Sequence, residues 1–141
     1  MMNREIWTYA VLVLGAATYG CTSLPESTRT AVVHDVKVEE KLSADTLRVN
    51  PGDEVRWVNS RKLPVQVEVP NVKSEDLSCE RGFSNWMGSV NEIARLKPNQ
   101  TASLCFKKAA LINFLVRAET SLGGGMQVLP GTVTVGSSVV R

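Results

Sequence analysis

Two segments with alternating apolar residues constrain the fold of this 141-residue chain more than any other feature. Apolar and polar side chains alternate along Glu54–Asn59 and again along Val65–Val69. Successive side chains of a β-strand point to opposite faces, so a period of two indicates a strand with one buried face. A Pro51–Gly52 turn precedes the first segment, and a basic turn at Arg61–Lys62 separates the two. We therefore predict two consecutive strands of a β-sandwich.

Other segments have the length and composition of strands, with turn signals between them. They are Val32–Val38, Thr46–Val49, Thr101–Lys107, Ile112–Ala118 and Thr132–Val135. A set of about seven short strands predicts an all-β fold, a small Greek-key β-sandwich. The connection 70–98 is unusually long for a compact domain. We expect it to be partly helical and to cover the sheet with Phe83, Trp86 and Ile93.

The segment Gly52–Asn59 reads GDEVRWVN and leads through a short loop to Pro64 and Val65. It resembles the cupredoxin (plastocyanin-like) family of small blue copper proteins, in which Gly-acidic-x-Val-x-aromatic-x-Asn leads to Pro-His. In that family this His is the first copper ligand, and Val65 stands in its place here. The segment Leu129–Val135, LPGTVTV, is similar to the family's closing Met-x-Gly-x-Val-x-Val. The resemblance covers roughly residues 32–136 and implies a cupredoxin-type sandwich.

The resemblance also implies where the other copper ligands would stand. Cupredoxins supply Cys, His and a weak axial Met from one loop between the last two strands. Here Ala118 or a neighbour takes the place of the Cys, and Leu129 that of the Met. The loop between them contains Gly123–Gly125 and no His. We therefore expect Val65, Ala118 and Leu129 to mark lost ligand positions at an apolar, closed end of the sandwich.

A divergent copper site is the alternative. Met126 is the only soft ligand in the same loop, and the single histidine, His34, precedes the first signature strand. A blue copper site requires two imidazoles and a thiolate, so we expect no copper, no other metal and no cofactor. We interpret His34 as a surface residue of the first strand.

The first residues of the chain have the build of a bacterial export signal. Arg4 precedes an apolar run, Ile6–Leu14, and small residues lead to Gly20 and Cys21. A small residue before Cys is what a lipoprotein signal peptidase requires, so we predict lipid attachment at Cys21. A cleaved secretory signal or a short membrane anchor is the alternative. Thr22 rather than Asp after the Cys favours the outer membrane of the bacterial cell envelope, with the protein facing the periplasm.

These patterns divide the chain into three parts. We expect a lipoprotein signal peptide at 1–20, a lipid-anchored flexible tether at 21–31 and a cupredoxin-like domain at 32–141. The tether is polar, with Pro25 and several Ser and Thr residues. The last part has the length of one small domain with a single core.

With Cys21 lipidated, Cys79 and Cys105 remain. In an exported and oxidising compartment, an even pair most simply forms a disulfide. Alternation places Cys105 on the face opposite Leu104, so we expect it to anchor the 70–98 connection from an outward-facing position. A redox-active pair is the alternative, although Cys-x-x-Cys spacing is absent.

Composition and the scatter of polar residues exclude several function classes. The formal net charge is +2, without a basic stripe, so we expect no nucleic-acid partner. The carboxylates are scattered on turns and the only His lies near the tether, so we expect no enzyme. The remaining prediction is a binding or structural module with an envelope protein as its partner. Copper electron transfer and ligand carriage, including transient metal handling, are the alternatives.

Overall fold

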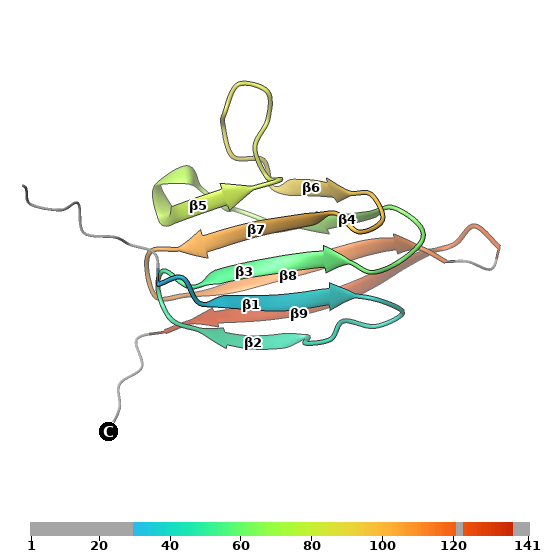
Figure 1. Cartoon of the computed structure of the whole chain (residues 1–141), viewed down its shortest axis with the longest axis horizontal. Coiled ribbons are helices and arrows are strands. Elements are labelled where there is room, and N and C mark those ends of the chain that lie inside the picture. Colours follow the sequence, from blue (N-terminus) through green and yellow to red (C-terminus); the bar gives the residue numbers. More distant parts are fainter. Residues whose placement is uncertain (1–29, 121–122, 137–141) are drawn as a thin grey trace, which may run out of the picture.

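The computed structural model describes residues 30–120 and 123–136 (Figure 1). The predicted signal peptide, Cys21 and most of the predicted tether lie outside the described residues. In chain order the elements are β1 (Val33–Val38), β2 (Thr46–Val49), β3 (Glu54–Asn59), β4 (Val65–Glu68), η1 (Ser74–Asp76), β5 (Leu77–Arg81), β6 (Ile93–Leu96), β7 (Thr101–Phe106), β8 (Ala110–Glu119) and β9 (Met126–Val135).

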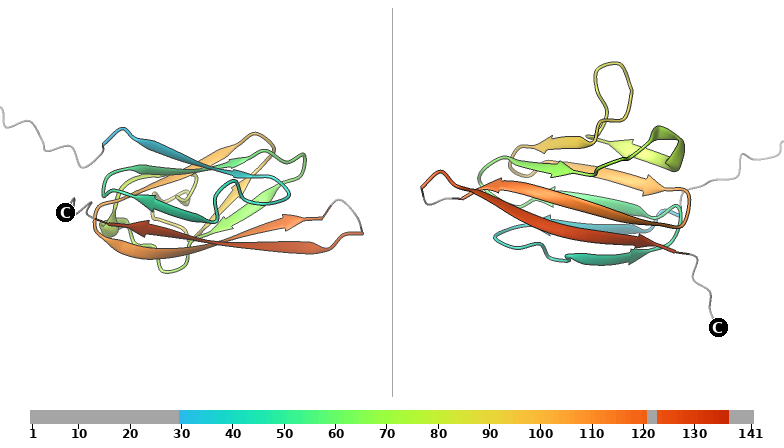
Figure 2. Two further views of the ribbon diagram at one scale, coloured as in Figure 1. Left: turned by 90° about the horizontal axis from the view of Figure 1, so that it is seen from below. Right: turned by 180° about the vertical axis from the view of Figure 1, so that it is seen from behind.

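The strands form two sheets that pack face to face (Figure 1, Figure 2). One sheet has the order β1-β3-β7-β5 and the other the order β2-β9-β8-β4-β6. Most neighbours are antiparallel, but β1 is parallel to β3 and β2 is parallel to β9. Inward and outward side chains alternate along β3 and β4, as the period of two requires. The predicted all-β sandwich is confirmed.

All the predicted strands are present, and the largest change concerns the last one. β9 begins at Met126 rather than Thr132, because it pairs with β8 along its whole length. The ladder runs from Glu119 opposite Met126 to Ala110 opposite Val135. Much of the segment expected to be an open loop is therefore part of a long β-hairpin.

The connection 70–98 is not the partly helical excursion that we expected. Its helical part is the short 3₁₀ turn η1, and most of its regular structure is in β5 and β6. β5 pairs with β7 and β6 pairs with β4, so each becomes an edge strand. Extended backbone at these positions gives the exposed N–H and C=O groups of β7 and β4 hydrogen-bond partners, which a helix could not do. Ile93 is half-buried at the start of β6. Within the described residues, no helix is long and apolar enough to cross a bilayer.

The core between the sheets is centred on three aromatic side chains that are almost fully buried. The ring of Trp57 lies 5.6 Å from that of Phe83 and 5.4 Å from that of Phe114, both in edge-to-face contact. Gly131 lies opposite Phe114 in the β8–β9 ladder. A Cβ at Gly131 would lie 2.2 Å from the ring, so only glycine leaves room for Phe114 there.

The segment between β5 and β6 projects from the sandwich (Figure 1). Asn85 organises its turn: the side-chain oxygen accepts the N–H of Met87 at 2.9 Å and that of Ser89 at 3.0 Å. Trp86 and Met87 are 92% and 70% exposed. The expectation that Trp86 covers the sheet is therefore wrong, because this ordered turn carries it away from the core. Phe83 does cover the core, as expected.

Candidate functional site

The predicted copper-ligand positions lie at one end of the sandwich. Val65 begins β4 and stands directly opposite Ala118 of β8. The side chains of Val65 and Ala118 are 1% and 0% exposed. Leu129 of β9 stands in the next row, opposite Val116, and packs against the core. These positions therefore contribute aliphatic carbon and no nitrogen or sulfur ligand atom.

Asn59 fixes the loop that leads into this end. Its amide is fully buried at the end of β3. Nδ2 donates to the carbonyl of Leu63 at 2.9 Å and to that of Leu96 at 3.0 Å, while Oδ1 accepts the N–H of Arg61 at 2.9 Å. A buried amide is tolerated when its donors and its acceptor are paired, as they are here. The geometry of the turn therefore comes from one side chain of β3.

The side chain of Arg61 connects several segments at the same end. Its guanidinium donates to the carbonyl of Glu39 at 3.0 Å and to that of Glu119 at 2.6 Å. Nε2 of Gln127 donates to the carbonyl of Glu40 at 3.2 Å. These hydrogen bonds connect the turn between β1 and β2 with the facing ends of β8 and β9. We refer to Arg61, Gln127 and the carbonyls they bind as the polar clamp.

The described residues at this end do not fit type 1 copper. Such a site requires a thiolate and two imidazoles close together. His34 pairs with Val55 near the start of β3, whereas Val65 follows the end of β3, so the histidine lies at the opposite end of the sandwich. Met126 lies at the same end as Val65, next to Gln127, but its side chain is 58% exposed at the tip of the β8–β9 hairpin.

His34 forms part of a polar site at its own end. Its Nε2 lies 2.9 Å from Oδ2 of Asp53, a residue that is 2% exposed. Asp53 also accepts hydrogen bonds from the hydroxyl of Thr30 and, at 3.0 Å, from the backbone N–H of Asn50. Burying a carboxylate is costly unless donors surround it, and these donors do so. His34 is therefore a partly buried partner of Asp53 rather than the plain surface residue that we expected.

The surroundings of Asp53 keep it ionised. Burial by itself would raise the pKa of the carboxyl group. The hydrogen bonds from Thr30, Asn50 and His34 stabilise the carboxylate and outweigh burial, so the pKa lies below its ordinary value. The ionised carboxylate orients the imidazole of His34.

A cavity of about 410 Å³ opens beside this pair. Its lining residues are His34, Arg48, Val49, Asn50, Asp53, Thr134 and Gly136. The guanidinium N–H groups of Arg48 suit a small anionic or polar ligand. The described residues that line this cavity include no Ser or Cys.

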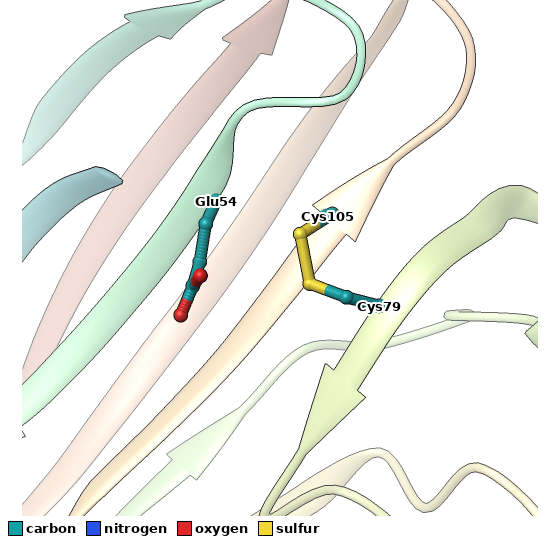
Figure 3. Close-up of side chains that lie close together, drawn as sticks. All are labelled: Glu54, Cys79 and Cys105. Atoms are coloured by element: carbon teal, nitrogen blue, oxygen red, sulfur yellow. A yellow bond between two sulfur atoms is a disulfide. The ribbon is translucent and has the colours of Figure 1, made fainter. Parts of the chain in front are cut away.

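Cys79 and Cys105 form the predicted disulfide, with their Cα atoms 4.8 Å apart (Figure 3). Cys105 of β7 lies opposite Cys79 of β5 on one side and opposite Glu54 of β3 on the other. The three residues form one row across three adjacent strands, on the face turned away from the core. Cys105 points to this outer face as expected but is fully buried, because β3 and β5 flank it and the disulfide covers its sulfur.

Comparisons with known proteins identify a likeness of fold. No family model matches the chain, and no curated protein matches it significantly. A Cu(I) form of a mutant amicyanin is 20% identical with a TM-score of 0.46, over 75% of this chain and 82% of that chain. An oxidised amicyanin mutant is 21% identical with a TM-score of 0.46, over 79% and 87%. The likeness is one of fold alone.

Two neighbouring carboxylates were missed as site residues when the sequence was considered alone. Asp53 and Glu54 belong to the carboxylates that are scattered along the sequence, yet Asp53 pairs with His34 and Glu54 lies beside the disulfide. The turn from Asn50 to Asp53 carried a usable signal, because an Asp at the end of a Pro-Gly turn commonly accepts a nearby backbone N–H. The position of Glu54 beside the disulfide depends on the register of β3 against β7, and no local sequence pattern predicts that register.

Replacing Asp53 with Asn should lower the free energy of unfolding at neutral pH by about 1–3 kcal/mol, because hydrogen bonds to a buried charged group are lost. The pKa of Asp53 is depressed in the folded state, so its stabilisation is complete above the unfolded pKa of about 4 and is lost as the pH falls through the folded value. Wild-type protein should therefore lose stability on acidification more steeply than Asp53→Asn. Urea unfolding at a series of acidic pH values measures both effects.

Asp35→Asn is the matched control for this experiment. Asp35 pairs with Arg56 at 2.7 Å on the surface, and the hydrogen bond from Arg56 lowers its pKa as well. Exposed ion pairs contribute only about 0–1 kcal/mol, so this variant should change stability little. Equal losses in the two variants would contradict the role assigned to the buried carboxylate.

Proposed function

We propose that this protein is a lipid-anchored, cupredoxin-like module of the bacterial cell envelope that works without type 1 copper and binds another envelope protein. One observation carries the proposal. At the end of the sandwich where copper ligands would stand, the corresponding residues are the aliphatic Val65, Ala118 and Leu129, and the polar clamp connects the segments around them. Aliphatic side chains at these positions offer copper no ligand atoms. The role left to the domain is that of a binding or structural accessory.

The turn at Trp86 supports a contact with a protein partner. An indole that is 92% exposed keeps a large apolar surface in water, which favours its burial elsewhere. The hydrogen bonds to Asn85 hold the turn in shape, so little backbone order must be gained on binding. Trp is also enriched among residues that dominate interface energies. We assign this turn to a partner protein that presents an apolar pocket.

The N-terminal sequence supports the anchor. Gly20 and Cys21 follow an apolar run, and a polar stretch separates Cys21 from β1. Several acyl chains on one cysteine hold a protein at a membrane stably, whereas a single chain binds only marginally. The polar stretch would let the folded domain sample the space around the anchor.

Oxidised protein mixed with stoichiometric Cu(II) should show no intense visible absorption, because the thiolate-to-copper bond that produces it cannot form. Val65→His should stay colourless too, since it restores one imidazole and leaves the thiolate and the second imidazole missing. Visible absorption and removal of copper by a mild chelator are the measurements. A blue, stoichiometric and redox-reversible complex would overturn the proposal and favour an electron carrier with a divergent site.

Cys21→Ser should move the protein from the detergent-extracted membrane fraction to the soluble envelope fraction, or leave its signal unprocessed, because the acylated thiol is lost. Fractionation of cells and gel migration check this. Thr22→Ser is a suitable control, since it leaves the cysteine and the residue before it unchanged. If Cys21→Ser fractionates and migrates like wild type, the anchor is wrong.

Trp86→Ala should reduce crosslinking to a specific envelope protein by about 10-fold or more, because truncating a central interface residue commonly costs over about 1–2 kcal/mol. Leu111→Ala is the matched control: Leu111 is 66% exposed on β8, away from the turn. Crosslinking in whole cells followed by affinity purification gives the yields. Undiminished crosslinking of Trp86→Ala would contradict the assignment. If the variant instead loses binding to protein-free lipid vesicles, the turn contacts the membrane surface rather than a protein.

A further inference from the structure

We propose that reduction of the Cys79–Cys105 disulfide creates a Zn²⁺ site in which both thiolates and the carboxylate of Glu54 are ligands. The site lies on the outer face of the β1-β3-β7-β5 sheet, far from the positions expected for copper. It is independent of the function proposed above, since neither the end that contains Val65 nor the turn at Trp86 takes part.

The strand register places the three ligands together. Glu54, Cys105 and Cys79 occupy directly opposite positions on β3, β7 and β5. Their ligand atoms all lie within 4.8 Å of one another (Figure 3). A tetrahedral zinc ion with bonds of about 2.0–2.3 Å holds its ligand atoms roughly 3–4 Å apart. Once the S–S bond is broken, side-chain rotation is enough to bring the three atoms to that spacing.

A polar cavity gives solvent access to the row. Its volume is about 230 Å³, and its lining residues are Glu54, Ser78, Cys79, Glu80, Arg81 and Ser103. Three protein ligands leave the fourth position of a tetrahedral zinc ion for a water molecule, which the cavity can hold. The site therefore has both the ligands and the room that a bound ion requires.

The charges around the row suit a divalent cation. Two thiolates and one carboxylate carry three negative charges, of which Zn²⁺ neutralises two. Arg81 lines the cavity in the neighbouring row, opposite Ser103, and can balance the remainder. Thiolate ligands select zinc over magnesium and calcium, which prefer oxygen ligands alone.

The switch is a two-electron thiol–disulfide exchange. A thiolate of an external dithiol attacks Sγ of Cys79, which is only half-buried, and the thiolate of the buried Cys105 leaves. The second thiol of the reductant then attacks the reductant's first sulfur in the mixed disulfide, and the thiolate of Cys79 leaves. The reductant becomes a cyclic disulfide, and zinc binding displaces the protons that remain on the two protein thiols.

The full chain carrying Cys21→Ser restricts the thiols to this pair and is the protein to test. It is reduced with a dithiol, desalted without oxygen and titrated with Zn²⁺ against a chromophoric chelator. We expect one Zn²⁺ per reduced chain, and binding weaker by about 100-fold or more in the oxidised chain, which has no thiolate. Co²⁺ used as a probe should produce sulfur-to-metal charge-transfer absorption in the reduced chain alone.

Glu54→Gln tests the third ligand and Glu80→Gln is its matched control, because Glu80 lines the same cavity outside the ligand row. Glu54→Gln should weaken zinc binding by at least about 10-fold, since even loss of an outer partner of a metal site costs about 10- to 100-fold. Glu80→Gln should bind like the parent. Equal zinc affinities of the parent and Glu54→Gln would overturn the proposal. This result is also the one expected if reduction unfolds the chain, because two unstructured thiols would then bind zinc without Glu54. Equal binding by oxidised and reduced protein would also overturn it.

Discussion

The contact of Trp57 with Phe83 and Phe114 is the interaction on which the rest of the structure depends. Trp57 belongs to one sheet, Phe114 to the other and Phe83 to the segment after β5, so one cluster fixes three parts of the chain. The indole N–H of Trp57 is buried with no hydrogen-bond partner among the described residues, at a cost of about 1–3 kcal/mol. Each edge-to-face contact contributes about 0.5–1.5 kcal/mol beyond burial, which offsets much of that cost. Because this central cluster holds the sheets together, the two ends of the sandwich can differ in character. The end at Val65 is apolar and carries the polar clamp, whereas the end at His34 and Asp53 is polar.

The parts of the fold that could be predicted are those with a repeating local pattern. β3 and β4 alternate cleanly because one face of each packs on the core. β5 has no clear pattern because Leu77 is its one buried position. β6 buries Ala94 and Leu96, but its four residues are too few for the alternation to stand out within a long connection. Their extended shape is imposed by β7 and β4, whose unpaired edges need hydrogen bonds. No local preference of residues 70–98 reports that requirement.

The site residues show the same division. Cys79 and Cys105 could be paired in advance because the chain offers few cysteines. Glu54 could not be joined to them, because its position beside Cys105 follows from the register of β3 on β7, strands far apart in sequence. Trp86 illustrates the opposite error: a large apolar residue is normally assigned to the core, and only the hydrogen bonds of Asn85 reveal a turn that directs it to solvent. Sequence patterns report burial on average, whereas sites depend on individual contacts.

The parallel ladder between β2 and β9 has a consequence for the order in which the chain folds. Thr46–Val49 pairs with Thr132–Val135 at the edge of its sheet, and β9 is its one neighbour there. Ladders between distant segments form slowly, since a long loop must close before any contact is gained. The second sheet cannot be completed until the last strand has left the ribosome. For a chain exported before it folds, as its N-terminal segment predicts, this late closure would keep the polypeptide open for translocation.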